Sequence, residues 1–174
     1  MTEIIETFRS INLQNERPIW IRPPKMRAAA ENLTIFLDGE LYRDRVDAPS
    51  VIDALHGEIA DSWFVFVSMG SVEARWLECP CHPPFAKFIV EELLPWLELR
   101  YPEIKAIRAR VLVGLSYTGL AAAFIARQYP AIFQRVISQS GSFWWNDCWL
   151  TEQYRTQPRI PRCVLLGSRH QRSG

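Results

Sequence analysis

Residues 110–123 read RVLVGLSYTGLAAA, and this stretch decides the fold. The apolar run Arg110 to Val113 predicts a buried strand, and Leu120 to Gln128 predicts an alanine-rich helix. Between them Ser116 lies in a short glycine-bordered segment, the pattern of a nucleophile elbow, in which a sharp strand-to-helix turn holds a serine clear of the backbone. A serine hydroxyl is a poor nucleophile and needs such exposure, a base and oxyanion donors. Ser116 is therefore the candidate nucleophile.

The residues around Ser116 suit this turn. Gly114 and the pair Thr118-Gly119 provide the small residues that let strand and helix backbones approach closely. The N-terminus of the helix that follows would favour an oxyanion through its dipole. The alternative is an ordinary strand-to-helix loop in which Ser116 only caps the helix, because short Gly/Ser patterns also arise by chance.

Strand-like and helix-like segments alternate along the rest of the chain, which predicts an α/β fold with a mostly parallel sheet covered on both faces. One domain spanning residues 1–174 is expected. The other expected strands are an antiparallel edge hairpin at Ile4 to Ile11 and Pro18 to Arg22, and strands at Leu33 to Leu37, Trp63 to Val67, Arg135 to Ser138 and Cys163 to Leu166. A crossover helix is expected at Ser50 to His56, capped by Ser50, and an amphipathic helix from Phe85 to Leu97, kinked at Pro95. The segment from Cys79 to Pro84 is expected to be a surface loop.

Composition excludes several classes of partner. The net charge is +1 with no long charged run, so nucleic acid is not expected as a partner. No signal peptide and no membrane-spanning stretch is expected, so no membrane partner is predicted either. Four irregularly spaced cysteines do not suggest a disulfide framework, which favours a reducing, cytoplasmic location.

Several segments together resemble one family. They are ERPIWIRPP (16–24), FLDGE (36–40), Arg75 with Glu78, EELLPW (91–96), GLSYTGL (114–120) and SQSGSFWW (138–145). From about Arg17 to Trp145 the chain resembles the enterochelin-esterase-like, esterase D-like branch of the α/β-hydrolases, which hydrolyse esters of iron siderophores and related compounds. The resemblance implies a three-layer α/β-hydrolase fold and a serine esterase that forms an acyl-enzyme on Ser116, uses no cofactor and acts on a small-molecule ester, a ferric siderophore being one candidate.

The same resemblance implies further site residues. The oxyanion donors would be the backbone N–H of Tyr117 and an N–H near Gly39 and Glu40. Arg75 would lie at the mouth of the site and bind anionic oxygens of the ligand, although a surface pair with Glu73 or Glu78 explains it equally well. Trp144 and Trp145 would border the substrate cleft, with core packing as the alternative.

Thr118 departs from the family, which usually has a glycine at this position of the elbow. A β-carbon there is expected to crowd the turn and to weaken activity.

The rest of a catalytic triad is not identifiable. This fold orders its triad as serine, acid, histidine, and after the strand at Cys163 to Leu166 only His170 offers a base, one strand earlier than the family places it. The final strand and helix of the fold would be missing. The chain would then expose a sheet edge, with self-association as a consequence, and an inactive truncated hydrolase or a ligand-binding pseudoenzyme is the alternative function.

His56 and His82 lie where the family has no base and are expected to be incidental. A zinc site at Cys79, Cys81 and His82 is the other alternative, although the spacing lacks a second ligand pair and no metal is expected.

Overall fold

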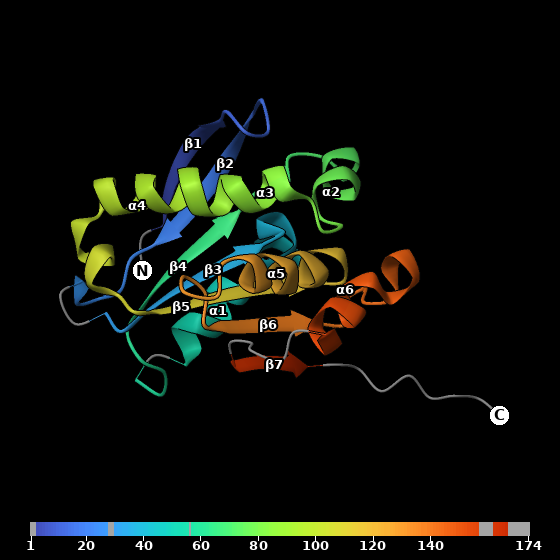
Figure 1. Ribbon diagram of the computed structural model, residues 1–174. Helices are drawn as coiled ribbons and strands as arrows, with labels where there is room; N and C mark the ends of the chain where they lie inside the picture. Colours follow the sequence, from blue (N-terminus) through green and yellow to red (C-terminus); the bar gives the residue numbers. More distant parts are fainter. Residues whose placement is uncertain (1–2, 28–29, 56, 157–161, 167–174) are drawn as a thin grey trace.

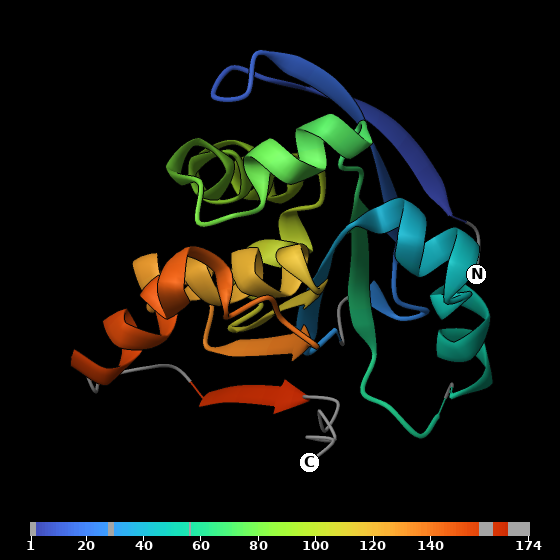
Figure 2. The same ribbon diagram turned by 90° about the vertical axis from the view of Figure 1, so that its right-hand side faces the viewer.

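The computed structural model describes residues 3–27, 30–55, 57–156 and 162–166, the last of these as backbone. A seven-stranded sheet has helices on both faces (Figures 1 and 2). Its strands are β1 (Ile4–Ser10), β2 (Asn15–Arg22), β3 (Asn32–Leu37), β4 (Ser62–Val67), β5 (Ala109–Leu115), β6 (Arg135–Gln139) and β7 (Arg162–Leu166). The helices are η2 (Leu41–Arg45), α1 (Ala48–Ala54), α2 (Val72–Glu78), α3 (Pro83–Lys87), η3 (Phe88–Leu93), α4 (Leu94–Arg100), η4 (Pro102–Ala106), α5 (Tyr117–Gln128) and α6 (Trp145–Thr156).

The strand order is β1-β2-β4-β3-β5-β6-β7. The hairpin β1-β2 is antiparallel and joins β4 in antiparallel register, whereas every pairing from β4 to β7 is parallel. The predicted α/β class and the antiparallel N-terminal edge are therefore confirmed. Because β3, β5 and β6 are parallel neighbours, the segments that follow them emerge at the same edge of the sheet.

Alternating side chains divide the core between the two faces of the sheet. Ile35 and Val65 point into the larger cluster beneath α3, η3, α4 and α5, whereas Phe36, Phe64 and Phe66 point to the opposite face under η2 and α1. The period of two residues along each strand dictates this division. Figure 2 shows the two helical layers on either side of the sheet.

The predicted amphipathic helix runs from Pro83 to Arg100 as α3, η3 and α4, drawn as one long helix in Figure 1. Its middle turn, η3, is a π-helix that directly precedes Pro95. Proline has no N–H and its ring crowds the carbonyl four residues earlier, so a wider turn before it relieves the clash. A kink was expected at Pro95, and the structure has a π-helical segment before the proline in its place.

Three details of the sequence prediction were wrong. The N-cap of α1 is Asp47, not Ser50, because Pro49 fits the first turn of a helix that begins at Ala48. The segment from Cys79 to Pro84 is not simply a surface loop, since Cys79 is fully buried and Pro83 and Pro84 start α3. Helix α5 begins directly after Ser116, three residues earlier than expected.

Helices α2 and α6 were not anticipated from the sequence. Helix α2 carries the one sequence signal that was available, the N-cap Ser71, whose hydroxyl accepts a hydrogen bond from the Ala74 amide at 3.1 Å. Across the described part of the chain, no helix combines the length and the apolar character needed to cross a bilayer.

Candidate active site

Ser116 connects the carboxyl end of β5 to the first turn of α5 in a strained conformation. Its φ is 56° and its ψ is −117°, a region that non-glycine residues rarely occupy. Two backbone hydrogen bonds hold it: its N–H donates to the Gln139 carbonyl at 2.9 Å, and its carbonyl accepts from the Ser142 N–H at 3.0 Å. The end of β6 and the turn after it therefore bind the serine backbone on both sides and stabilise the strained turn.

The glycines of the elbow are required by close backbone contacts. A β-carbon on Gly114 would lie 2.2 Å from the Thr118 carbonyl oxygen, and one on Gly119 would lie 2.7 Å from the hydroxyl of Ser138. No larger residue fits at Gly114 unless the backbone moves, because its neighbour there is a carbonyl group. Gly114 is thus explained by the contact between β5 and α5, and Gly119 by the contact between α5 and β6.

Thr118 does not crowd the turn as expected. Its side chain is fully buried, and its hydroxyl accepts from the Leu115 N–H and donates to the Leu115 carbonyl, both at 2.8 Å. The threonine therefore ties the last residue of β5 to the first turn of α5. The effect of this substitution on activity stays a prediction.

The hydroxyl of Ser116 lies 3.1 Å from the hydroxyl of Ser142, a residue in the turn after β6. Ser142 is buried, with 2% of its surface exposed. Sequence reasoning noted the SGS run but gave Ser142 no role, because its approach to Ser116 depends on the pairing of β5 with β6.

The segment after β3 lies next to the elbow, since β3 and β5 are paired. Gly39 passes so close to β4 that a β-carbon would lie 3.0 Å from the backbone of Phe66 and Val67. The Glu40 carboxylate accepts hydrogen bonds from the Ser68 hydroxyl and the Met69 amide. The two segments that the sequence assigned to the oxyanion hole, around Gly39 and at Tyr117, are thus adjacent in space.

A further contact fixes this segment to the site. The Tyr42 hydroxyl donates to the side-chain oxygen of Gln139 at 2.6 Å. Burial raises the pKa of the Tyr42 phenol, with the nearby Asp38 carboxylate adding to the effect. Helix η2 is therefore tied to the same residue of β6 that holds the Ser116 amide.

Arg75 reaches the site from α2. Its Nε donates to the Asp38 carboxylate at 2.6 Å, and one terminal nitrogen donates to the Leu115 carbonyl at 3.3 Å. It pairs with Asp38 and with neither acid that the sequence suggested, and the Glu78 carboxylate instead binds the buried Arg17 at 2.9 Å. Burial raises the pKa of Asp38, and the hydrogen bond and charge of Arg75 oppose that shift.

Three aromatic rings follow one another beside the elbow. Tyr117 contacts Trp76 edge to face at a centroid distance of 4.7 Å and Trp144 at 5.8 Å. Trp144 is 65% exposed, whereas its neighbour Trp145 packs against the core. The two adjacent tryptophans thus face different environments, and Trp144 is the one beside Tyr117. Sequence reasoning missed Trp76 because it lies on the unexpected helix α2.

A cavity of about 240 Å³ opens beside these groups, lined by Asp38, Glu40, Met69, Gly70, Ser71, Val72 and Arg75. It joins the segment after β3 to the N-terminal half of α2. A ligand bound there would lie next to the proposed oxyanion donors.

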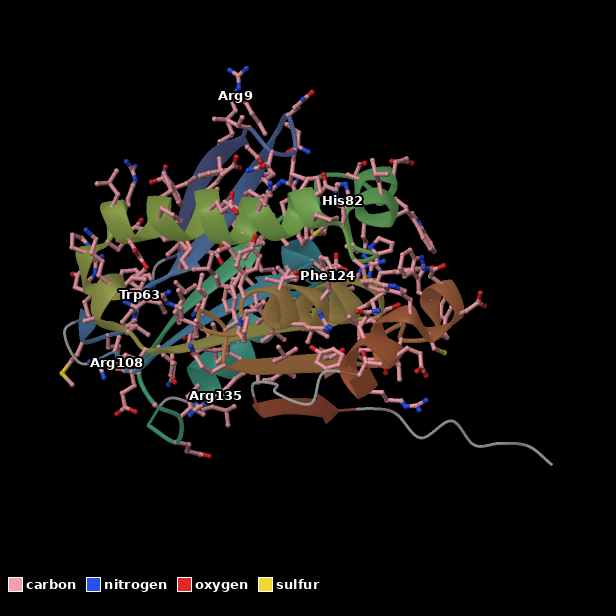
Figure 3. All side chains as sticks on the ribbon, in the orientation of Figure 1. Arg9, Trp63, His82, Arg108, Phe124 and Arg135 are labelled. Atoms are coloured by element: carbon pink, nitrogen blue, oxygen red, sulfur yellow. The ribbon has the colours of Figure 1, made fainter. Side chains whose placement is uncertain are left out.

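The histidines add no base to the described site. His82 is the N-cap of α3, at the start of the long helix in Figure 3, and burial lowers the pKa of its imidazole. His56 and His170 lie outside the described residues. Cys79, Cys81 and Cys148 are free thiols, and no cluster of three or more candidate metal ligands occurs within the described ranges.

A parallel sheet in which a strained serine joins a central strand to a helix N-terminus defines the α/β-hydrolase class. The chain belongs to the family described as "Putative esterase", whose model matches residues 10–166.

Two groups of relatives agree with this assignment. The chain is 32% identical over 163 residues to the iron(III) enterobactin esterase of Dickeya dadantii. The matched residues cover 91% of this chain and 38% of that protein. It superimposes on the enterochelin esterase of Shigella flexneri with a TM-score of 0.85 and 25% identity, over 94% of this chain and 44% of that one. An enterobactin esterase from Shigella flexneri in the presence of enterobactin matches with a TM-score of 0.81 and 28% identity. The match covers 90% of this chain and 42% of that one. The chain therefore spans less than half the length of these relatives.

Proposed function

We propose that this chain is a serine esterase that cleaves a carboxylic ester through an acyl-enzyme on Ser116. The observation that carries the proposal is the backbone of Ser116, which is held at positive φ between β5 and α5 by two backbone hydrogen bonds with the end of β6 and the turn that follows it. Strain of about 1–3 kcal/mol at one residue persists only where surrounding structure over-determines it, and such residues cluster at active sites. A serine that only capped the helix would not need this conformation.

The proposed reaction has two steps. The Ser116 oxygen attacks the ester carbonyl, the hydroxyl proton passes to a base, and the tetrahedral oxyanion accepts hydrogen bonds from the Tyr117 N–H and an N–H near Gly39 or Glu40. The C–O bond to the alcohol breaks, and the alcohol leaves with a proton returned by the base. Water then attacks the acyl-enzyme in the same way, releasing the acid and Ser116.

We propose His170 as the base. Leu115, Gln139 and Leu166 are register partners across β5, β6 and β7, so the chain leaves β7 level with the elbow and two strands away. Two strand spacings are about 10 Å, and four extended residues span about 13 Å, so a residue at position 170 is within reach of the site.

We infer that the ester is of the siderophore type and that Arg75, Trp144 and Trp145 border its binding cleft. The relatives named above are enterobactin esterases, and one of the solved structures was obtained in the presence of enterobactin. Trp144 beside Tyr117 and the cavity beside Arg75 support a cleft on either side of Ser116.

We infer that copies of the chain self-associate. In the described structure β7 is an edge of the sheet, and an apolar groove of about 600 Å³ crosses the adjacent face over Phe36, Phe64 and Val113. Unpaired parallel edges and apolar patches favour association. Light scattering after size-exclusion chromatography tests this inference, and a mass of one chain at high concentration would contradict it. A cytoplasmic location remains our inference from the small number of cysteines.

A fluorophosphonate probe tests the proposed nucleophile. Wild-type protein is expected to gain one adduct by intact mass, and Ser116→Ala is expected to gain none. Ser50→Ala, at an exposed serine of α1, is the matched control and should label like wild type. The absence of a Ser116-dependent adduct would exclude the enzyme and leave the ligand-binding alternative. His170→Ala, compared with His82→Ala, then tests the base through the labelling rate and the release of acid from ferric enterobactin.

A further inference from the structure

The two proposed halves of the oxyanion hole come from segments far apart in the sequence. One is the turn after β3 at Asp38 to Glu40, and the other is the elbow at Leu115 to Tyr117. An oxyanion hole works only if its donors are held at a fixed separation before the reaction begins. The side chain that touches both segments is Arg75 of α2.

Arg75 uses two different nitrogens for the two segments. Its Nε binds the Asp38 carboxylate at 2.6 Å, directly before Gly39, and a terminal nitrogen binds the Leu115 carbonyl at 3.3 Å, directly before Ser116. The planar guanidinium fixes the angle between these two bonds, which a flexible ammonium group does not do. We call this arrangement, Asp38 with Arg75 and the Leu115 carbonyl, the Arg75 link.

Both acceptors of the Arg75 link are themselves held in place. Asp38 adopts a left-handed conformation with φ of 74°, and its carbonyl accepts from the Tyr42 amide at 3.2 Å. The Leu115 carbonyl also accepts from the Thr118 hydroxyl at 2.8 Å. The link therefore joins two rigid turns, and a change in it would move one turn relative to the other.

The helix that carries Arg75 is anchored at both ends. Ser71 caps its start, and Glu78 near its end accepts from Asn15 and from Arg17, whose side chain is 1% exposed. Arg17 also donates to the Ser68 carbonyl at 3.1 Å. Because α2 is fixed to β2 and to the end of β4, Arg75 reaches the site from a rigid support.

We propose that Arg75 is a positioning residue that sets the distance between the Gly39–Glu40 turn and the Tyr117 amide. The inference rests on the proposed function and deepens it, since it gives Arg75 a role toward the protein's own turns in addition to any contact with a ligand. A buried carboxylate at Asp38 is costly, and a pair of apolar residues would serve stability equally well. Apolar residues would not reproduce the two hydrogen bonds at a fixed angle that the guanidinium makes to Asp38 and Leu115.

The experiment compares Arg75→Met, Arg75→Lys and Asp38→Asn with a matched ion pair. Arg110 and Glu98 also pair at 2.6 Å with partial burial, but Arg110 lies at the end of β5 opposite to Leu115, and Glu98 lies on α4. Arg110→Met is therefore the control for the loss of a partly buried ion pair far from the elbow. Each variant is measured for its fluorophosphonate labelling rate, its midpoint of urea unfolding, and amide hydrogen exchange in segments 38–41 and 115–118.

Arg75→Met is expected to slow labelling by about 100-fold, the usual consequence of misplacing a group by about 1 Å, and to accelerate exchange in both segments together. Arg75→Lys should recover only part of the labelling rate, because one ammonium group cannot reproduce the two hydrogen bonds of the guanidinium. The labelling rate of Asp38→Asn should lie between those of wild type and Arg75→Met. Arg110→Met should change neither quantity. The proposal is overturned if Arg75→Met and Arg110→Met lower stability and labelling to the same extent.

Hydrogen exchange separates this proposal from the proposed function. If wild-type protein is not labelled, the esterase proposal fails while the Arg75 link is still judged by exchange. Faster exchange in both segments of Arg75→Met then supports the link, and faster exchange in one segment alone, or in neither, overturns it. If wild type is labelled and Arg75→Met reacts at the same rate, the esterase stands and the link fails.

Discussion

Replacing Ser116 with glycine is expected to give a more stable protein than replacing it with alanine. At an ordinary position the order is the reverse, because glycine loses more conformational freedom on folding. At Ser116 the φ of 56° penalises any residue with a β-carbon. Both variants remove the hydroxyl and its 3.1 Å contact with Ser142, so that loss cancels in the comparison.

The expected difference follows from two opposing contributions. Relief of backbone strain favours glycine by about 1–3 kcal/mol. The greater freedom of glycine in the unfolded chain costs about 0.4–1 kcal/mol. The Ser116→Gly variant should therefore unfold with a free energy about 0.5–2 kcal/mol higher than Ser116→Ala, which for a chain of this size is a difference of roughly 2–6 °C in Tm.

Urea unfolding followed by circular dichroism measures this difference, provided that the m-values of the two variants agree. Ala74→Gly, in the middle of α2, is the control and should lose about 0.5–1 kcal/mol relative to wild type. If Ser116→Ala is as stable as Ser116→Gly, or more so, the strained elbow and the argument for a nucleophile that depends on it are refuted.

Three further predictions concern other parts of the fold. Gly114→Ala, whose β-carbon would meet a backbone carbonyl at 2.2 Å, should abolish labelling of the elbow and lower the urea midpoint; retention of wild-type values would show that β5 and α5 are less closely packed. Arg17→Met should cost about 3–5 kcal/mol by leaving the Glu78 carboxylate buried without its partner, and a loss below 1 kcal/mol in urea unfolding would contradict this. The exposed Cys148 should react with iodoacetamide at pH 7.5 well before Cys79, because burial raises the pKa of the Cys79 thiol to about 12; peptide mass spectrometry would show the reverse order if this is wrong.

Much of the framework could be predicted from local patterns. The edge hairpin, the parallel strands and the helix after Ser116 follow from hydrophobic period, turn residues and the elbow motif, and the structure places them within a few residues of the predicted bounds. The seven-residue helix α2 was missed, although α1, which has the same length, was anticipated from its turn signals. Arg75 was proposed as a site residue, but the helix that carries it was not expected.

The roles of individual side chains were harder to predict. Thr118 was expected to crowd the elbow because a β-carbon takes space, but its hydroxyl forms two hydrogen bonds with Leu115 that no propensity describes. Arg75 had Glu73 and Glu78 as neighbours in sequence, but its carboxylate partner is Asp38, which is 37 residues away. In both cases the contact depends on how the folded chain places two segments side by side, which local sequence patterns do not specify.

The sequence by itself determined the local conformation at Ser116, because a strand, a glycine-bordered serine and an alanine-rich helix lie next to one another in the chain. Only the tertiary structure decided which groups surround that serine. The strand order brings the segments after β3 and β6 to either side of β5, so Ser142 contacts Ser116 across 26 residues and Arg75 joins Asp38 to Leu115. Hydrophobic period determines which face of a strand is buried, but it does not specify which strands are neighbours, and the environment of the nucleophile depends on that order.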